Sequence, residues 1–330
     1  MKNITPKSLA VYEAFSGIGG GAEAAKANKL KLVGACEQNP NAATVYLLNH
    51  GHHPYSNIWT IDPSKIPHMD ILFASPPCTS YSKIGKRKGL LDPAGRVVFA
   101  LEPLVAFHKP KAFIIENVCE FATFGGGRVL EMVSASFERH GYHSLTDERS
   151  WRKFNSAKFG TATQRIRFFG VMLRQDYDPD ALVWPDPSLP MVPLSSVLLP
   201  EDEVRHLIFK RRDYVPVEQP KRGVYSPRKI GFFDKDYRDR YVYSAAGPAA
   251  TYCRSNSGLA SSSGLYMTDA GVIRKLHPRE MLRSMGYSDS FVLPMPYGIA
   301  ARLIGNSLCP PVLADVFKMV KRVISKGRVS

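Results

Sequence analysis

Short apolar runs that stop at polar or Gly/Pro turns recur along the first half of the chain. Five of them are typical of β-strands: Leu9–Phe15, Leu30–Cys36, Ile71–Ala74, Ala112–Ile115 and Arg167–Leu173. Three stretches between them have the pattern of helices: Ala22–Lys29, Asn41–Asn49 and Leu130–His140. Strands that alternate with helices predict an α/β fold, in which helices cover both faces of a parallel sheet.

The pattern changes after about Asp176. Prolines become frequent from Pro179 to Pro200, and basic residues mix with aromatic ones from Arg205 to Arg240. Regular patterning returns at Pro278–Met285, and a final amphipathic helix is expected at Pro311–Ser325. We therefore expect three parts: a first domain over residues 1–175, a smaller one over 176–298, and a C-terminal segment, 299–330, that returns to the first domain.

The net charge of the chain indicates which class of partner it binds. A formal net charge of +15 and a pI near 9.6 predict attraction to a polyanion, and nucleic acid is the usual one. No apolar run approaches the roughly 20 residues that a membrane span needs. The first ten residues, MKNITPKSLA, lack the pattern of a secretory signal, so we expect a cytoplasmic protein with no membrane partner.

The five cysteines are scattered along the chain: Cys36, Cys78, Cys119, Cys253 and Cys309. They form no C-x-x-C pair and no zinc-site spacing, so we expect reduced thiols and no bound metal. Most should be small core residues, because free cysteine is often buried. A nucleophile among them has to be identified by its neighbours.

A glycine-rich turn, Ser16–Gly21, joins the first expected strand to the first helix. Such a turn brings bare backbone amides close to a ligand at the carboxyl edge of the sheet, although an ordinary tight turn has the same composition. It is not the G-x-G-x-x-G pattern of dinucleotide sites. Glu37 ends the next strand, where a carboxylate can accept both ribose hydroxyls of an adenosine. Together they indicate a cofactor that contains a nucleoside.

Cys78 follows two prolines that bar a helix or a sheet ladder and present its thiol from a rigid turn. A thiol is a good nucleophile only as the thiolate, which a basic surrounding favours. The next loop, residues 83–89 (KIGKRKG), supplies basic charge and contains glycines that would let it close over phosphates. The alternatives are an inert buried thiol and a solvated charge run.

Three further polar residues stand at strand ends. Glu116 follows an apolar strand, and a partly desolvated glutamate there can donate a proton to a ring nitrogen. Arg165 and Arg167 are two apart at the start of a strand, so they are expected to point to one face and to reach an oxyanion and a phosphate. The alternative for each arginine, taken singly, is an ordinary surface residue with no part in a site.

In this order and spacing, the motifs resemble those of the DNA (cytosine-5) methyltransferase family. The resemblance covers nearly the whole chain except about residues 176–245, and no single motif in it is decisive. The matching segments are FSGIGG at 15–20, Glu37, PPC at 76–78, DPAGR at 92–96, ENV at 116–118, RIR at 165–167, LHPRE at 276–280 with MGY at 285–287, and GNSL at 305–308. The succession of PPC, ENV, R-x-R and GNS is highly specific.

Four positions depart from the family pattern. Thr79 and Thr163 stand where glutamine is common, and Gln38 replaces a bulky residue after the ribose-binding acid. Asn57 stands where the family often has an aspartate that faces the adenine amino group. The side-chain oxygen of asparagine still accepts that hydrogen bond. None of the four touches the expected chemistry.

The resemblance implies a Rossmann-like S-adenosylmethionine-dependent methyltransferase sheet with a second, smaller target-recognition domain. It implies that Cys78 adds to carbon 6 of a flipped-out cytosine in duplex DNA and that carbon 5 is methylated. Glu116 then acts on N3, Arg167 holds O2, and Arg165 binds a backbone phosphate. Asn117 and Thr79 are expected to orient the site.

The resemblance also implies two sets of binding residues. The cofactor-binding set is Phe15, Ser16, Gly17, Gly19, Gly20, Glu37, Asn57, Ile58, Pro77, Asn306 and Ser307. The DNA-binding set, chosen for basic charge, is Ser82, Lys83, Lys86, Arg87, Lys88, Arg211, Arg212, Arg228 and Lys229. We expect a monomeric bacterial or phage modification enzyme that acts on double-stranded DNA, releases S-adenosylhomocysteine, and has a restriction endonuclease partner for the same site.

Four other classes of protein are alternatives to this expectation. An RNA cytosine-5 methyltransferase of the same fold is the nearest, but the long variable region before Gly247 favours DNA. A catalytically silent DNA-binding regulator is disfavoured because Cys78, Glu116, Arg165 and Arg167 occur together. An amino-methyltransferase would have an aromatic residue after the two prolines, and a nicotinamide dehydrogenase would have its glycine pattern.

Overall fold

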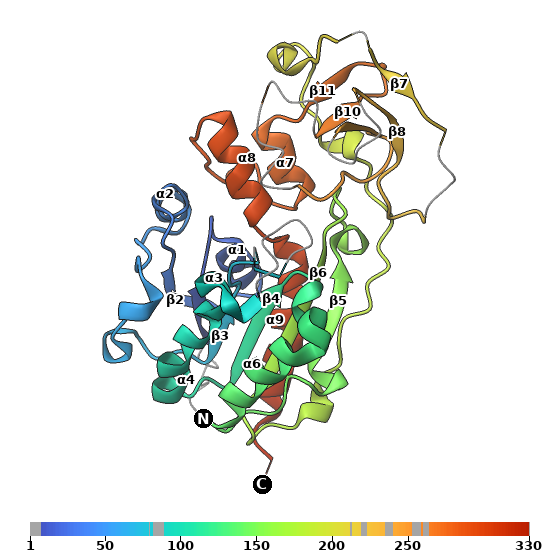
Figure 1. Cartoon of the computed structure of the whole chain (residues 1–330). Helices are drawn as coiled ribbons and strands as arrows, with labels where there is room; N and C mark the ends of the chain where they lie inside the picture. Colours follow the sequence, from blue (N-terminus) through green and yellow to red (C-terminus); the bar gives the residue numbers. More distant parts are fainter. Residues whose placement is uncertain are drawn as a thin grey trace, which may run out of the picture. The chain divides into compact units, whose positions relative to one another are not determined.

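The structure is a computed structural model of the 330-residue chain. It describes residues 8–78, 80–81, 89–211, 213–218, 223–234, 240–252, 259 and 264–329. The chain packs into two compact units, both shown in Figure 1. The first is made of Met1–Phe154, Ile166–Asp186 and Leu313–Ser330, and the second of Asn155–Arg165 and Pro187–Val312.

A six-stranded sheet forms the centre of the first unit, with strand order β2-β1-β3-β4-β6-β5. Its strands are β1 (Ala10–Ala14), β2 (Lys31–Cys36), β3 (Ile71–Ala74), β4 (Ala112–Asn117), β5 (Trp151–Asn155) and β6 (Ile166–Leu173). The pairs among β2, β1, β3 and β4 are parallel, and β6 runs antiparallel to β4. The expected α/β fold with a largely parallel sheet is confirmed.

Helices cover both faces of this sheet. They are α1 (Gly20–Ala27), α2 (Pro40–His50), α3 (Pro93–Arg96), α4 (Glu102–His108), α5 (Glu120–Thr123), α6 (Arg128–Glu138) and α9 (Pro310–Lys326). Leu72 of β3 lies in a buried cluster with Leu104 of α4 and Val133 of α6. Its neighbour Phe73 points to the opposite face, where its ring centre is 6.0 Å from that of Phe317 in α9.

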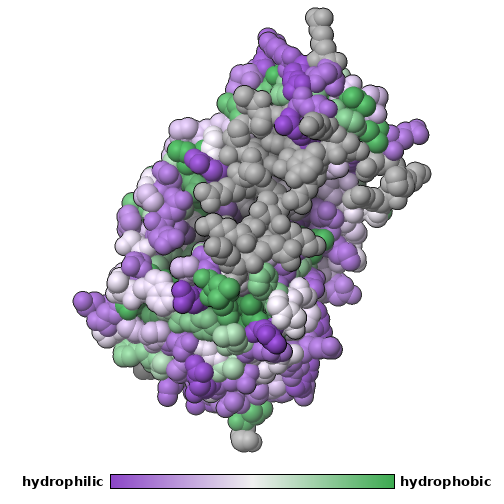
Figure 2. Space-filling view, viewed as in Figure 1, coloured by the Kyte–Doolittle hydropathy of each residue, from purple (hydrophilic) through white to green (hydrophobic). Residues whose placement is uncertain are grey.

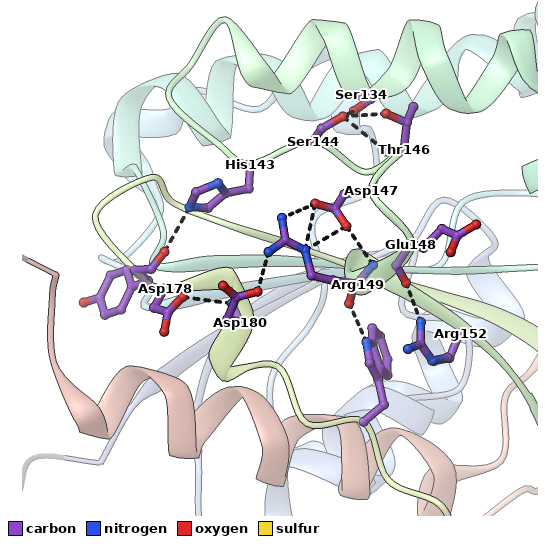
Figure 3. A network of polar contacts seen from close by, with 12 residues as sticks. Ser134, His143, Ser144, Thr146, Asp147, Glu148, Arg149, Arg152, Asp178 and Asp180 are labelled. Atoms are coloured by element: carbon purple, nitrogen blue, oxygen red, sulfur yellow. Dashed lines mark hydrogen bonds and ion pairs between the residues drawn. The ribbon is translucent and has the colours of Figure 1, made fainter.

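A polar network keeps the chain after β6 on the first unit (Figure 3). Arg149 pairs with both Asp147 and Asp180. Its backbone oxygen accepts a 2.6 Å hydrogen bond from Nε1 of Trp184, and His143 contacts the backbone oxygen of Tyr177 at 2.9 Å. These contacts explain why this proline-rich stretch packs with the first unit as far as Asp186.

The second unit contains a five-stranded sheet of order β11-β10-β9-β8-β7. Its elements are β7 (Val215–Pro216), β8 (Lys229–Phe232), β9 (Tyr241–Ser244), β10 (Leu265–Met267), β11 (Ile273–Lys275), α7 (Pro278–Ser284) and α8 (Tyr297–Asn306). The described part of its sheet core is small: Phe233, Val242 and Leu265 are fully buried together, and Phe209 and Tyr214 pack against them.

A fully buried ion pair joins β11 to α7. Arg274 donates hydrogen bonds of 2.7 and 2.8 Å to the two carboxylate oxygens of Glu280. Glu280 also accepts the backbone N–H groups of His277 and Leu199, each at 2.7 Å. Both its oxygens are therefore fully used, and the same carboxylate caps the first turn of α7.

The stretch Tyr297–Lys326 is long and apolar enough to cross a membrane, by length and composition alone. In the structure it is divided into α8 and α9, and 72% of its most apolar window is buried within the protein. Such burial is typical of a core helix in a soluble protein. On the face seen in Figure 2, the described surface is mostly hydrophilic and its apolar residues form separate patches.

Candidate active site

The carboxyl ends of β3 and β4 place the expected nucleophile turn beside the expected glutamate. The two strands are parallel, with Ala74 opposite Ile115, so the residues that follow them are neighbours. Ser75 donates a 2.6 Å hydrogen bond from Oγ to Oε2 of Glu116. Asn117 donates from Nδ2 to the backbone oxygen of Pro76 at 3.1 Å. Two hydrogen bonds therefore fix the turn that carries Cys78 to the end of β4.

Glu116 is buried, with only 4% of its surface exposed. Nε of Arg167 lies 3.5 Å from its Oε1, and this atom has no hydrogen-bond partner among the described residues. Arg167 reaches it from β6, because the next residue, Phe168, pairs with Asn117 of β4. Since the Cys78 thiol is only partly buried, the site offers a thiol and a carboxyl beside a guanidinium.

Arg165 belongs to the second unit, whereas Arg167 belongs to the first. The side chain of Arg165 is buried, and its Nη2 donates a 3.1 Å hydrogen bond to the backbone oxygen of Gly305. Its backbone N–H donates to Oγ of Ser156 at 3.0 Å. The structure thus fixes Arg165 to the end of α8, and its expected contact with a phosphate stays a prediction.

The turn after β1 has a backbone that favours glycine. Phe15, Gly17 and Gly19 have φ angles of 57°, 55° and 96°. A Cβ atom on Gly19 would lie 2.1 Å from Nε2 of His50, so the turn is packed tightly against the last turn of α2. A Cβ atom on Gly17 would have no atom of the described residues within 4 Å, which leaves the backbone open to them on that side.

Glu37 stands directly after β2 and is tied to the same turn. Its Oε2 accepts the N–H of Gly17 at 2.8 Å, and its Oε1 accepts the N–H of Asn39 at 2.7 Å. Burial raises the pKa of this carboxyl, and these backbone hydrogen bonds act in the opposite direction. An ionised carboxylate has about four acceptor positions, so these backbone donors leave room for a donor such as a ribose hydroxyl.

Glu13 is a site residue that the sequence analysis missed. It is buried in β1, and its two oxygens accept the N–H groups of Gly21 at 2.8 Å and Ala22 at 2.9 Å. Gly19, the N-cap of α1, has no side chain to do this, so Glu13 satisfies the first turn of the helix. An acid inside the apolar run AVYEA was the available signal.

The other expected cofactor residues lie in four places. Asn57 is exposed and accepts the N–H of Trp59 at 3.0 Å, while Ile58 beside it is buried. Pro77 is half-buried in the nucleophile turn, and Gly20 begins α1. Asn306 ends α8 in the second unit, and the hydroxyl of Ser307 contacts that of Tyr287.

The expected DNA-binding residues are only partly described. Ser82, Lys83, Lys86, Arg87, Lys88 and Arg212, together with Thr79, lie outside the described residues. Arg228 is exposed, and Arg211 pairs with Asp213 and Asp234. Lys229 is buried, with Nζ 3.6 Å from the centre of the Tyr241 ring. Of these three residues, Arg228 is the most accessible to a phosphate.

Comparison with known proteins identifies relatives over the whole chain. A family model described as "C-5 cytosine-specific DNA methylase" matches residues 9–322. The Type II methyltransferase M.HhaI of Haemophilus parahaemolyticus is 31% identical over 309 residues, which cover 92% of each protein. The Type II methyltransferase M.HaeII of Haemophilus aegyptius is 29% identical over 312 residues, covering 94% of this chain and 92% of that protein.

Solved structures show the same fold. The S. pombe Dnmt2 methyltransferase matches with a TM-score of 0.69 at 20% identity, over 96% of this chain and 99% of that one. The Entamoeba histolytica methyltransferase EhMeth matches with a TM-score of 0.71 at 18% identity, over the same shares of the two chains. At these identities the likeness is one of fold alone.

Proposed function

This chain belongs to the C-5 cytosine-specific DNA methylase family, and on that premise we propose that it methylates cytosine through a covalent Cys78 adduct. Membership makes it a DNA (cytosine-5-)-methyltransferase with an S-adenosylmethionine-dependent methyltransferase fold. The observation that supports the covalent route is the pair of hydrogen bonds, from Ser75 and Asn117, that hold the thiol turn beside buried Glu116.

The route begins when the Cys78 thiolate adds to carbon 6 of the cytosine. The new C–S bond moves the ring electrons toward carbon 5, and Glu116 assists by giving a proton or a hydrogen bond to N3. We assign Arg167, whose Nε lies 3.5 Å from Oε1 of Glu116, to holding O2. Once carbon 5 is methylated, its proton leaves to solvent and the C–S bond breaks, which returns the Cys78 thiolate.

S-adenosylmethionine, which enzymes of this class use, supplies a methyl group on a positively charged sulfur. The residues around the β1 turn fit such a group. Ser16 has a buried Oγ with no hydrogen-bond partner among the described residues, and Glu37 keeps acceptor positions for a ribose. We assign the adenosine part to Phe15–Gly20, Glu37, Asn57 and Ile58. Pro77, Asn306 and Ser307 are assigned to the methionine part.

The target cytosine has to leave the helix to reach a thiol at the sheet edge, so we propose that it is flipped out. The first unit then carries the chemistry, and the second carries most of the target recognition, with Arg211, Arg228 and Lys229 among its basic residues. Since the named relatives are Type II methyltransferases, we propose a restriction-modification role for a monomeric enzyme, with an endonuclease that cuts the same site.

The test is transfer of labelled methyl groups to duplex DNA, together with trapping on duplexes that contain 5-fluorocytosine. We expect a covalent complex with the wild type and none with Cys78→Ser. Cys119→Ser is the matched control, because this cysteine is also half-buried and is likewise not in a disulfide. A Cys78→Ser protein that still forms the adduct would exclude the mechanism. Bisulfite sequencing of DNA from the expressing cells identifies the target sequence.

A further inference from the structure

A groove with basic walls lies in the first unit between the end of α1 and the last turns of α9. We name it the basic groove. Its lining includes Asn28, Lys29, Lys318, Lys321, Arg322 and Lys326. It is separate from the nucleophile turn and the β1 turn, and neither the proposed chemistry nor the proposed cofactor site uses it.

The two walls of the basic groove are fixed to each other. Nδ2 of Asn28 donates hydrogen bonds to the backbone oxygens of Ala24 in α1 and Ala314 in α9, at 3.1 and 2.9 Å. In return, Nζ of Lys321 donates to the backbone oxygen of Asn28 at 3.1 Å. The cations of α9 are therefore held at a set position relative to Lys29.

The cations of the groove have no acidic partner among the described residues. Lys29, Lys318, Lys321, Arg322 and Lys326 are exposed, and in the described parts of the chain no carboxylate comes within 4.0 Å of any of them. On α9, positions 318, 322 and 326 are each one helical turn apart, a spacing at which like charges destabilise a helix. An anionic ligand would remove this cost.

Lys318, Arg322 and Lys326 form a row of cations along α9, and the length of this row indicates the class of ligand. From Lys318 to Lys326 the helix rises about 12 Å. A DNA duplex presents about seven phosphates over that length, whereas a single phosphate would engage one end of the row. Among the described residues that line the groove there is no aromatic side chain on which a base could stack, so the groove suits a phosphate backbone and does not read sequence.

The position of the groove shows which DNA it would hold. Helix α1 begins at Gly20, at the carboxyl edge of the sheet, and ends by the groove, where β2 begins at Lys31. The groove is therefore at the amino edge, and Cys78 is at the carboxyl edge, with the sheet of about 16 Å between them. The groove and the active site thus lie at opposite edges of the sheet, so we assign the groove to a DNA segment other than the one that holds the target cytosine.

We propose that the basic groove binds the phosphate backbone of a second DNA segment while the active site holds its target. The choice of DNA among polyanions rests on the activity of the family. A second point of attachment would keep the enzyme on a long DNA molecule when the active site releases its target duplex, because the groove is still bound to another segment of the same molecule.

The test uses a triple variant, Lys318→Gln, Arg322→Gln and Lys326→Gln. Lys321 is left unchanged because it holds the groove together. The matched control is Lys65→Gln, Lys109→Gln and Arg139→Gln, which removes the same charge from exposed positions elsewhere in the first unit. Each protein is first trapped on a short 5-fluorocytosine duplex, so that its active site is occupied. Binding of a second, labelled duplex without a target site is then measured against salt concentration.

We expect the trapped wild type and control to bind the second duplex. For the groove variant we expect a fall of tenfold or more at low salt and a salt slope smaller by about 2 to 3, near 0.9 for each lost phosphate contact. Methylation of a short duplex should be the same in all three proteins, which separates this inference from the proposed function. Failure of the trapped wild type to bind the second duplex, or an equal loss in the control, would overturn the proposal. The proposal would also be overturned if the groove of the trapped wild type bound polyglutamate and did not bind DNA.

Discussion

Gly19 and His50 show how little room the β1 turn has. The φ angle of Gly19 is 96°, and an added methyl group would overlap Nε2 of the buried His50 ring. Burial lowers the pKa of His50 to about 4, so the ring is neutral at physiological pH and adds no charge beside the turn. The turn is therefore shaped by contact with α2 as well as by its own glycines.

Gly19→Ala should weaken cofactor binding by tenfold or more, because the turn has to move to make room for the methyl group. Isothermal titration of S-adenosylmethionine into the purified protein measures this. Gly51→Ala is the control: its φ is also positive, at 76°, but nothing lies within 4 Å of the new Cβ. A double variant with His50→Ala should recover part of the affinity. Equal affinities of Gly19→Ala and wild type would contradict the tight packing.

Glu13 should give the fold a specific dependence on pH. Burial raises the pKa of its carboxyl from 4.5 to about 8, although hydrogen bonds from Gly21 and Ala22 lower it. The folded protein thus holds this proton more tightly than the unfolded chain does. The free energy of unfolding should fall as the pH rises from about 4.5 to about 8, by on the order of 1 kcal/mol per pH unit.

Urea denaturation at several pH values between 5 and 8 tests this dependence. Glu13→Gln removes the titrating group, so its stability should vary less with pH than that of the wild type. Glu23→Gln, three residues into α1, is the control and should keep the wild-type slope. A Glu13→Gln protein with an unchanged slope would show that another group is responsible.

At the scale of single residues, the sequence predicted best where a motif fixes both residue type and position. Cys78, Glu116 and Arg167 do lie around one sheet edge. Glu13 was missed because its hydrogen bonds go to the backbone, and backbone donors have no residue-type signal. The burial of Lys229 against the Tyr241 ring could not be predicted from the sequence either, since nothing in a basic stretch shows the direction in which a given lysine side chain points.

Elements were predicted according to how much apolar surface they bury. The strands β1 to β4 and β6 are apolar runs covered on both faces, and the sequence located them to within a few residues. The short strand β5 and the strands β7 to β11 were not located. They are between two and five residues long, and basic and aromatic residues interrupt their alternation.

The contact between β11 and α7 depends on one buried carboxylate. Glu280→Gln should lower the free energy of unfolding by about 3 kcal/mol, because Arg274 would keep its charge without a counter-ion in a fully buried place. Thermal unfolding followed by circular dichroism measures the change. Glu203→Gln, an exposed acid of the same unit, is the control and should change stability by less than about 0.5 kcal/mol. A similarly small change for Glu280→Gln would mean that the Arg274–Glu280 ion pair does not contribute to the free energy of unfolding.

On the scale of the whole molecule, the chain passes between the two units several times. The first unit is completed only by Leu313–Ser330, which supplies most of α9. Val316, Phe317 and Val320 are buried there, with Phe317 against Phe73 of the central sheet. No cut of the chain at a single point separates the described residues of one unit from those of the other.

Removal of residues 313–330 should therefore unfold the first unit, because it uncovers part of one apolar face of the sheet, including Phe73. We expect a truncated protein that is insoluble, or that binds a hydrophobic dye and has lost its cooperative thermal transition. Removal of residues 327–330 alone is the control, since these follow the end of α9 and should be dispensable. A soluble, cooperatively folding 1–312 fragment would contradict this dependence.

The late return of the chain to its first unit also sets the timing of synthesis. A ribosome makes β1, the β1 turn and the Cys78 turn early, but it has to add all of residues 187–309 before α9 begins. Until then part of one face of the central sheet is uncovered, and a chaperone can bind there. The central sheet of the nascent enzyme therefore closes only after Leu313–Ser330 has been made, so a newly made molecule becomes competent to modify DNA only after that segment has been synthesised.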